Sequence, residues 1–255
     1  MGVVNLTPDS FSDGGSFESA EAAVAHARRL IAEGADLIDI GGESTRPGSL
    51  GVPLDEERRR VLPVLEKLVG GTVPVSVDTQ KPELMREAVA AGAAMINDIN
   101  ALQAPGALEA VATGNAAVCL MHKKGAPADM QSDPRYDDVV GEVLAFLKAR
   151  VAAVRAAGIS PERIVVDPGF GFGKTLEHNL ELLRRLARFN ETGAVVMAGI
   201  SRKSMLGRII GRDVGERVYA SVAAALIAVQ NGARLVRVHD VAATRDALAV
   251  LNAVK

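Results

Sequence analysis

The sequence predicts an α/β fold, a single closed (β/α)8 TIM barrel over residues 1–255, with its active site at the carboxyl ends of the strands. Three observations predict it. Short runs rich in β-branched residues alternate with longer segments of helical periodicity, and this alternation repeats eight times. The chain has 255 residues, close to the usual size of such a barrel. Polar residues follow every short run, as at the catalytic face of a barrel.

The eight expected strands cover residues 1–6, 36–40, 73–77, 94–97, 116–120, 163–166, 194–198 and 234–238. An open doubly wound sheet is the alternative architecture. It needs no eighth strand, and it usually carries a glycine-rich nucleotide turn after its first strand. The sequence therefore favours the closed barrel.

Eight helices are expected between the strands, over residues 19–33, 54–69, 82–91, 105–113, 136–157, 176–187, 216–231 and 241–250. The prolines that suit a first helical turn are Pro82, Pro105 and Pro161. The glycines that suit a helix end, because glycine tolerates positive φ, are Gly34, Gly92, Gly158 and Gly232.

Composition sets the class of protein. The chain is 48% hydrophobic and 24% charged, with a net charge of -2, as expected of a soluble globular protein. It has 3% aromatic residues, no Trp and no basic tract, which argues against nucleic acid as a partner. No apolar stretch approaches the ~20 residues of a membrane span. The single cysteine, Cys119, excludes a disulfide within the chain and favours a cytoplasmic location.

The sequence contains partial matches to two nucleotide-binding motifs, and each match lacks a required glycine. Residues 168–175 end in Gly173-Lys174-Thr175 like a phosphate-binding P-loop, but Pro168 stands at the position of the leading glycine. The dinucleotide fingerprint fails because Leu176 occupies the place of its third glycine. The four histidines show no zinc-type spacing.

The polar clusters after the strands are the candidate functional residues. The first, residues 5–15, combines proline and paired glycines with many groups that can bind a cation, a phosphate or a polar heterocycle. A polar surface loop is the alternative for this segment. The others lie at residues 41–48, 78–79, 97–98, 121–124, 167–174, 199–204 and 237–240.

The ordered series of these motifs resembles dihydropteroate synthases, the pterin-binding TIM-barrel family of folate biosynthesis. The resemblance spans the whole chain and rests on residues 1–15, 41–48, 77–79, 96–98, 167–172, 201–204 and 237–239. It implies a transferase that condenses 6-hydroxymethyl-7,8-dihydropterin pyrophosphate with p-aminobenzoate, giving 7,8-dihydropteroate and pyrophosphate.

A carboxylate can accept both N–H donors of the guanidine-like edge of a pterin, and Asp167 is the candidate for that contact. A helix N-cap is the alternative role for Asp167. The pterin-binding residues that the resemblance implies are Asp78, Asn97, Met121, Asp167, Phe172 and Lys203.

The resemblance places pyrophosphate at Asn5, Thr45, Arg46, Arg237 and His239, with Asn5 as a ligand of Mg²⁺. Arg237 offers a planar fork to phosphate oxygens, and His239 lies two residues further along the strand, on the same side. The alternatives are that Arg237 pairs with a surface acid and that His239 and Asp240 merely end a strand.

The p-aminobenzoate slot is expected at Phe11, Pro47, Lys203 and Ser204. The expected catalytic residues are Asp13, Asp78, Lys203 and Arg237. Departure of pyrophosphate before attack would leave a cation on the pterin methylene, which Asp13 is placed to stabilise in a dissociative substitution. No strong general base is expected.

The resemblance also implies a homodimer. Sulfonamides target this family, but the sensitivity of this chain depends on loop geometry that the sequence does not fix. Two rival functions are a tetrahydrofolate methyltransferase domain, which needs no pyrophosphate site, and a catalytically idle pterin-binding homologue. Asn5, Arg46, Arg237 and His239 together argue against the methyltransferase.

Overall fold

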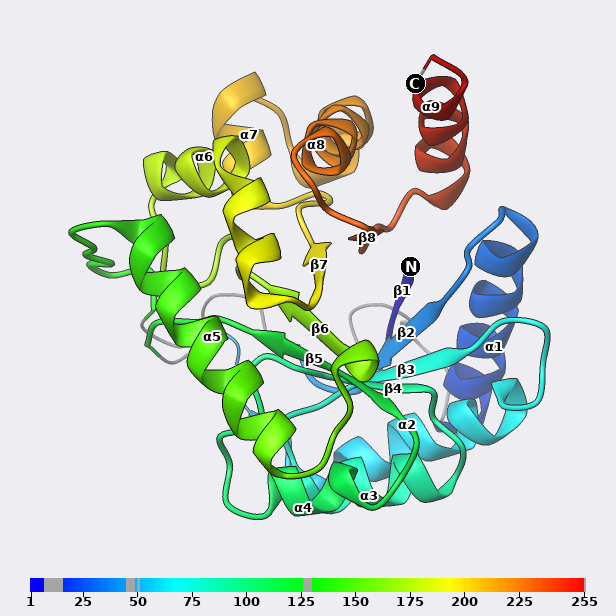
Figure 1. Ribbon diagram of the computed structural model, residues 1–255. Coiled ribbons are helices and arrows are strands. Elements are labelled where there is room, and N and C mark those ends of the chain that lie inside the picture. Colours follow the sequence, from blue (N-terminus) through cyan, green and yellow to red (C-terminus); the bar gives the residue numbers. More distant parts are fainter. Residues whose placement is uncertain (7–15, 45–48, 50, 126–129, 255) are drawn as a thin grey trace.

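The computed structural model describes residues 1–6, 16–44, 49, 51–125 and 130–254 (Figure 1). Eight parallel strands form one sheet in sequence order. They are β1 Gly2–Asn5, β2 Ile38–Gly41, β3 Val75–Asp78, β4 Met95–Asp98, β5 Ala117–Met121, β6 Ile164–Asp167, β7 Val195–Ala198 and β8 Leu235–Val236. The predicted (β/α)8 fold is confirmed.

The barrel closes between its last and first strands. Val3 N donates to Val238 O at 3.1 Å, and Val238 N donates to Met1 O at 2.9 Å. Gly2 and Val238 form a parallel bridge just beyond the short β8. These bonds satisfy the backbone groups that an open sheet would leave at its two edges.

Helices surround the strands (Figure 1). They are α1 Ser16–Ala32, α2 Leu54–Leu68, α3 Pro82–Ala90, α4 Ala107–Ala112, α5 Val139–Ala156, α6 Leu176–Arg184, α7 Ser204–Ile210, α8 Val218–Gln230 and α9 Val241–Ala253, with 3-10 turns η2 Pro161–Arg163, η3 Leu186–Thr192 and η4 Val214–Glu216. The short α7 and the turns η3 and η4 were not predicted, because a single turn or two shows little periodicity.

Most of the expected helix signals are correct. Pro82 lies in the first turn of α3 and Pro161 in that of η2. Pro105 does not lie in a helix: α4 begins at Ala107, after Gly106 in the left-handed conformation, so the predicted first-turn role of Pro105 was wrong. The glycines at the four expected helix ends all have positive φ, and they are Gly34, Gly92, Gly158 and Gly232.

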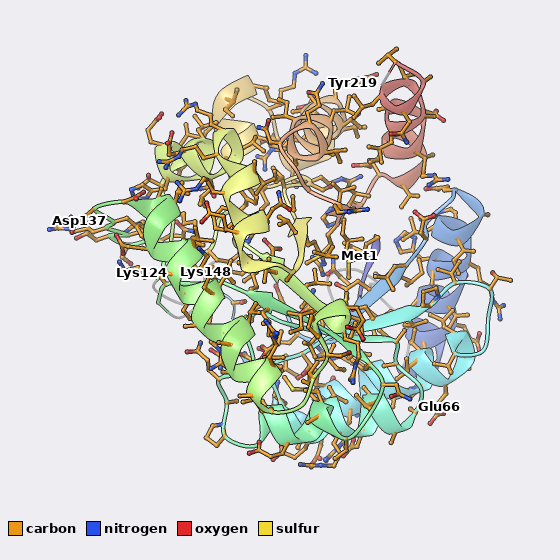
Figure 2. The ribbon with its side chains drawn as sticks, viewed as in Figure 1. Met1, Glu66, Lys124, Asp137, Lys148 and Tyr219 are labelled. Carbon is orange, nitrogen blue, oxygen red and sulfur yellow. The ribbon has the colours of Figure 1, made fainter. Side chains whose placement is uncertain are left out.

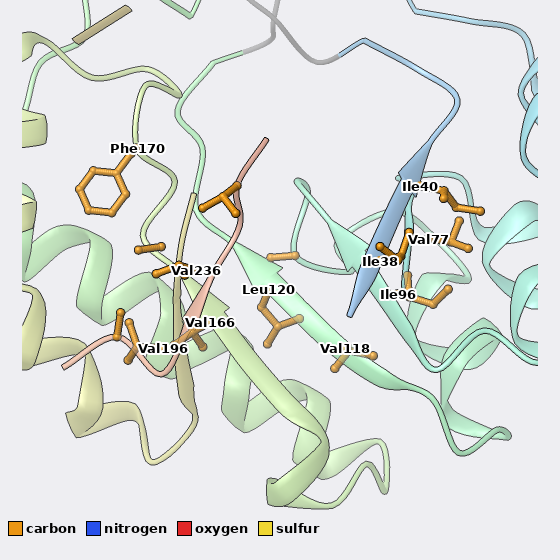
Figure 3. Packing of buried hydrophobic residues seen from close by; sticks show 14 of the residues in the cluster. Ile38, Ile40, Val77, Ile96, Val118, Leu120, Val166, Phe170, Val196 and Val236 are labelled. Carbon is orange, nitrogen blue, oxygen red and sulfur yellow. The ribbon is translucent and has the colours of Figure 1, made fainter. Parts of the chain in front are cut away.

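Strand alternation divides the interior into two apolar regions. Outward-facing residues pack against the helices, as Figure 3 shows for Ile38, Ile40 and Val77. Inward-facing residues at the amino ends of the strands fill the barrel floor. This smaller cluster consists of Met1, Met95, Cys119, Val165 and Met197. The floor excludes water from below, so only the carboxyl ends of the strands can hold an open pocket.

Substitutions at two helix-end glycines, Gly70 and Gly92, distinguish the stability cost of backbone strain from the cost of a steric clash. Gly92 has φ +98°, and an added Cβ would lie 2.8 Å from Val69 Cγ1; Gly70 has φ +81° and nothing within 4 Å. We expect Gly70→Ala to lose about 1 kcal/mol of unfolding free energy through strain. Gly92→Ala should lose more, because Val69 must also move. Urea denaturation measures both.

Gly51→Ala is the control, because Gly51 has no positive φ and no atom near its added Cβ. Equal losses in Gly70→Ala and Gly92→Ala would contradict the clash.

Candidate active site at the carboxyl ends of the strands

Polar side chains meet inside the barrel, directly above its apolar floor. They occupy inward-facing positions, four of them at or next to the carboxyl ends of strands, at Asp78, Asn97, Asp167 and Arg237, and one deeper within β2, at Asp39. The parallel register accounts for this, because it aligns Gly41 with Asp78 and Asp78 with Asn97. Period-two alternation then turns all of these side chains toward the same space.

Arg237 is the centre of this group. Its Nε donates to Asp39 Oδ2 at 2.6 Å, and its Nη2 donates to Asp78 Oδ2 at 2.9 Å. The Arg237 side chain is 22% exposed, whereas that of Asp39 is fully buried. Asn97 Nδ2 also donates to Asp39 Oδ2, at 3.2 Å. Arg237 therefore pairs with buried carboxylates, and the alternative of a surface acid was wrong.

Asp39 was not among the sequence-predicted site residues. It stands in the middle of a run that reads as an apolar strand, where an acid is rare unless it is paired. An acid within an apolar run was therefore the feature of the sequence that could have identified Asp39 as a site residue. Asp39 Oδ1 has no hydrogen-bond partner among the described residues, and neither does Ser76 Oγ on the neighbouring strand. Asp39 and Ser76 are register partners, so two buried polar atoms without partners come from adjacent positions below the pocket.

Burial and the charges around Arg237 shift the pKa values of Asp78 and of Arg237 itself. Two carboxylates share one guanidinium, and burial raises the pKa of Asp78 to about 8, against the opposing effect of Arg237. Burial alone would lower the pKa of Arg237, but Asp39 and Asp78 hold it above its usual value. Arg237 thus stays charged, and Asp78 can hold a proton at neutral pH.

Asp167 and Lys203 form a second charged pair of positions in the pocket. Asp167 Oδ1 accepts a hydrogen bond from Gly169 N at 2.7 Å. Burial raises the pKa of Asp167, although the Lys203 ammonium opposes the shift. Burial likewise lowers the pKa of Lys203 to about 8, and Asp167 opposes that shift. The α6 N-cap is Thr175, so the alternative N-cap role for Asp167 was wrong.

The loop after β6 holds Lys203. Lys203 Nζ donates to the carbonyl oxygen of Phe170 and lies 4.6 Å from the centre of the Phe172 ring. Met121 ends β5, is 5% exposed, and is the register partner of Asp167. The structure therefore brings Met121, Asp167, Phe172 and Lys203 together at adjoining strand ends.

Gly199 explains how closely the walls of the pocket approach one another. A Cβ at this position would lie 3.5 Å from Asp167 Oδ2 and 3.9 Å from Arg237 Cβ. The backbone of β7 thus runs between the two polar groups. Glycine keeps the space beside Asp167 open, which a longer side chain would fill.

The rim next to β1 and β8 carries Asn5 and His239. Both line a groove of about 830 Å³ that also contains Arg202. The Ser201 hydroxyl contacts His239 Nδ1 at 3.0 Å and accepts from His239 N at 3.2 Å. Asp240 forms a two-point ion pair with Arg202. His239 and Asp240 therefore have separate partners rather than simply ending the strand.

The loop after β2 is tied to its neighbours at its base. Glu43 Oε2 accepts from Val52 N at 3.0 Å, and Gln80 donates to Glu43 Oε1 at 2.9 Å. Lys81 pairs with Glu43 at 2.5 Å and with the buried Glu57. This network binds Glu43 and Val52, which lie on either side of Thr45 in the sequence. The network was not predicted from the sequence.

Several predicted site residues are not in the pocket interior or are not described. Ser204 is exposed at the start of α7, directly after Lys203. Phe11, Asp13, Thr45, Arg46 and Pro47 lie outside the described residues. Within the described ranges, no group of three or more His, Cys, Asp or Glu side chains is arranged to hold a metal ion. No described helix is both long enough and apolar enough to cross a membrane.

Comparisons with known proteins agree with this geometry. Residues 1–239 match the family model described as pterin binding enzyme. A dihydropteroate synthase of Neisseria meningitidis serogroup C is 54% identical over 253 residues, which is 97% of this chain and 89% of the relative. The chain is therefore related to that enzyme along nearly its whole length.

Solved structures give the same result. The Xanthomonas albilineans dihydropteroate synthase with 4-aminobenzoic acid is 58% identical, with a TM-score of 0.94, covering 100% of this chain and 92% of that one. A structure of dihydropteroate synthase from the same organism in complex with 7,8-dihydropteroate is 55% identical, with a TM-score of 0.91 and the same coverage. The eight-stranded barrel, its interior Asp, Asn and Arg residues and these similarities together show that the chain belongs to the pterin-binding enzymes, in the dihydropteroate synthase family.

Proposed function

We propose that this protein condenses 6-hydroxymethyl-7,8-dihydropterin pyrophosphate with p-aminobenzoate to give 7,8-dihydropteroate and pyrophosphate. The observation that carries the proposal is the gathering of Asp78, Asn97, Asp167, Lys203 and Arg237 in one barrel interior. Relatives at 58% and 55% identity bind 4-aminobenzoic acid and 7,8-dihydropteroate. One of these ligands is the second substrate, and the other is the product.

The pterin lies in the deep, acid-rich part of the pocket. Asp167 accepts the two N–H donors of its guanidine-like edge, a bidentate contact in a space with little water. Asn97 and Asp78 provide the remaining polar contacts, since an amide and a partly protonated carboxyl can each donate and accept. Met121 and Phe172 cover the apolar faces of the ring, and Lys203 donates to its carbonyl and nitrogen edge.

The pyrophosphate lies at the rim, where Thr45, Arg46, Arg237 and His239 bind it. Hydrogen bonds to Asp39 and Asp78 use two of the five N–H donors of Arg237, so donors remain for phosphate oxygens. Asn5 would supply an amide oxygen to Mg²⁺. Oxygen is the ligand that Mg²⁺ prefers, and an ion held through few protein atoms completes its shell with water and substrate phosphate. When bound, the ion neutralises charge on the departing pyrophosphate.

Bond cleavage precedes attack. The C–O bond to pyrophosphate breaks, the electron pair leaves with the pyrophosphate, and a cation remains on the pterin methylene. Asp13 stabilises this cation. The aniline nitrogen of p-aminobenzoate, held by Phe11, Pro47, Lys203 and Ser204, then attacks and loses a proton to water. Because the acceptor is a cation, no strong general base is needed.

The protein acts as a cytoplasmic homodimer in this proposal. The single cysteine, buried in the barrel floor, suits a reducing compartment. Exposed apolar residues on α7, η4 and α8 are candidates for the dimer contact, and they include Ile209, Val214 and Tyr219. Figure 2 labels Tyr219.

The first test mixes dihydropterin pyrophosphate, Mg²⁺ and the protein, with and without p-aminobenzoate. We expect dihydropteroate, detected by mass, only when both substrates are present, together with one equivalent of pyrophosphate. Tight pterin binding without product would instead indicate the idle homologue. Methyl transfer to a corrinoid would indicate the methyltransferase.

Removing the Arg237 cation tests the charge cluster. Arg237→Met leaves Asp39 and Asp78 without their partner, and we expect a loss of about 3 kcal/mol of unfolding free energy at pH 9.5. The pKa of Asp78 is about 8 in the folded wild type, and loss of the Arg237 cation raises it further, so the two proteins differ in the protonation of Asp78 only above about pH 8. The loss should therefore be smaller at pH 6 than at pH 9.5.

Urea denaturation at both pH values measures the effect. Arg245→Met removes an exposed pair with Asp36 and should cost less than about 1 kcal/mol. An equal loss at pH 6 and pH 9.5 in Arg237→Met would refute the model of two carboxylates left without their cation.

The charge of Lys203 predicts a pH profile. Its pKa is lowered to about 8, so kcat/KM for the pterin substrate should fall above about pH 8 as the ammonium deprotonates. In Lys203→Arg the side chain stays charged, and this decline should move beyond the measurable range. Lys148→Arg, at an exposed position, should keep the wild-type profile. If the decline persists in Lys203→Arg, it belongs to another group, with Asp78 the first candidate.

A further inference from the structure

Lys174 is a buried lysine that the mechanism above does not use. It lies in the loop between β6 and α6 and is 3% exposed. Its Nζ contacts Gly169 O at 2.9 Å, Phe172 O at 3.0 Å and His122 Nδ1 at 3.0 Å, with His122 O at 3.4 Å. All four atoms are hydrogen-bond acceptors or can act as one. No carboxylate is among them, so Lys174 is held by backbone carbonyls and one imidazole.

These contacts join two active-site loops that approach very closely. A Cβ on Gly169 would lie 1.9 Å from His122 O, and a Cβ on Gly173 would lie 2.1 Å from Lys124 O. Both glycines have positive φ, at +71° and +64°. The loop after β6 therefore presses its backbone against the loop after β5, and Lys174 binds both at their contact.

The imidazole in this cluster stays neutral. Burial and the neighbouring Lys174 lower the pKa of His122 to about 3. Its ring packs edge-on against Phe146, with centroids 5.0 Å apart. His122 therefore offers a neutral imidazole to Lys174 over the whole physiological pH range.

The loop that Lys174 binds also carries the groups that contact Lys203, the lysine of the proposed pterin site. Phe170 O accepts from Lys203 Nζ, and the Phe172 ring lies 4.6 Å from the same atom. Gly169, whose carbonyl binds Lys174, donates its N–H to Asp167. The segment from Asp167 to Phe172 thus has Lys174 on one side and the pocket on the other.

The choice of residue supports a role beyond packing. Burial lowers the pKa of Lys174 well below its usual value, and an apolar side chain of similar length would fill the space at lower cost. An apolar residue would, however, remove the donor to the Phe172 carbonyl and leave Gly169 O with only the backbone hydrogen bond from Phe172 N, at 3.2 Å. The Lys174 amine keeps both carbonyls turned toward it and so fixes the backbone between them.

We propose that Lys174 is a positioning residue for pterin binding, acting by fixing the Gly169–Phe172 loop so that Phe170 and Phe172 hold Lys203 in the pocket. This inference rests on the proposed function, because it concerns the affinity of the same pocket. Lys174 does not contact the pterin, and it acts through the loop.

The test compares Lys174→Met with wild type by calorimetric titration of dihydropterin pyrophosphate with Mg²⁺. We expect the Kd for the pterin substrate to rise at least tenfold. The Kd for inorganic pyrophosphate with Mg²⁺, whose proposed ligands do not include Lys203, should change less than threefold. A general loss of structure would weaken both, so this split is the readout that separates positioning from mere stability. Lys148→Met, at an exposed lysine on α5, is the matched control and should leave both constants unchanged.

His122 supplies a second, milder pair of variants in case Lys174→Met does not fold. His122→Asn can keep an acceptor near Nδ1 and should stay within threefold of the wild-type pterin Kd, whereas His122→Leu should weaken it at least fivefold. Equal pterin affinity in wild type and in a folded Lys174→Met, or in both His122 variants, would overturn the inference. Absence of pterin binding in the wild type would instead overturn the proposed function.

Discussion

The pairing of Arg237 with Asp39 and Asp78 is the interaction on which the site depends. It connects positions 198 and 159 residues apart in the sequence, and it exists only if β8 closes against β1 in register. Each member is acceptable inside the barrel because the others are there. Closure of the barrel and assembly of the pocket are therefore one event, since an open sheet would separate Arg237 from both carboxylates.

The apolar floor gives this cluster its strength. Met1, Met95, Cys119, Val165 and Met197 fill the inward positions below the charged layer, so water reaches the cluster only from the carboxyl ends of the strands. Charges interact more strongly where water is excluded, and the raised pKa of Asp78 reflects that environment. The same two-residue alternation that builds the floor also places the acids above it. Stability and function thus occupy successive layers of the same strands.

Much of this arrangement could be predicted from the sequence, because strand alternation and helix ends are local signals. The eight strands and the four helix-end glycines were correct. What could not be predicted is which distant groups meet. Asp39 reads as one acid in an apolar run until register places it beside Arg237, and Lys174 reads as part of a failed nucleotide motif until two loops meet around it. The roles assigned to Asp13 and Arg46 stay predictions, since both lie outside the described residues.

The distribution of charge gives the pocket two chemically different ends. Inside the barrel, the carboxyl groups of Asp39, Asp78 and Asp167 lie near the two basic side chains of Lys203 and Arg237. Because Asp78 can hold a proton at neutral pH, this interior carries little net charge and is instead rich in hydrogen-bonding groups. Arg237 contacts two of the acids and still has N–H donors that face no described partner, which in the proposed reaction serve the phosphate oxygens. One guanidinium therefore stabilises the interior carboxylates and, in that proposal, binds the leaving group at the rim.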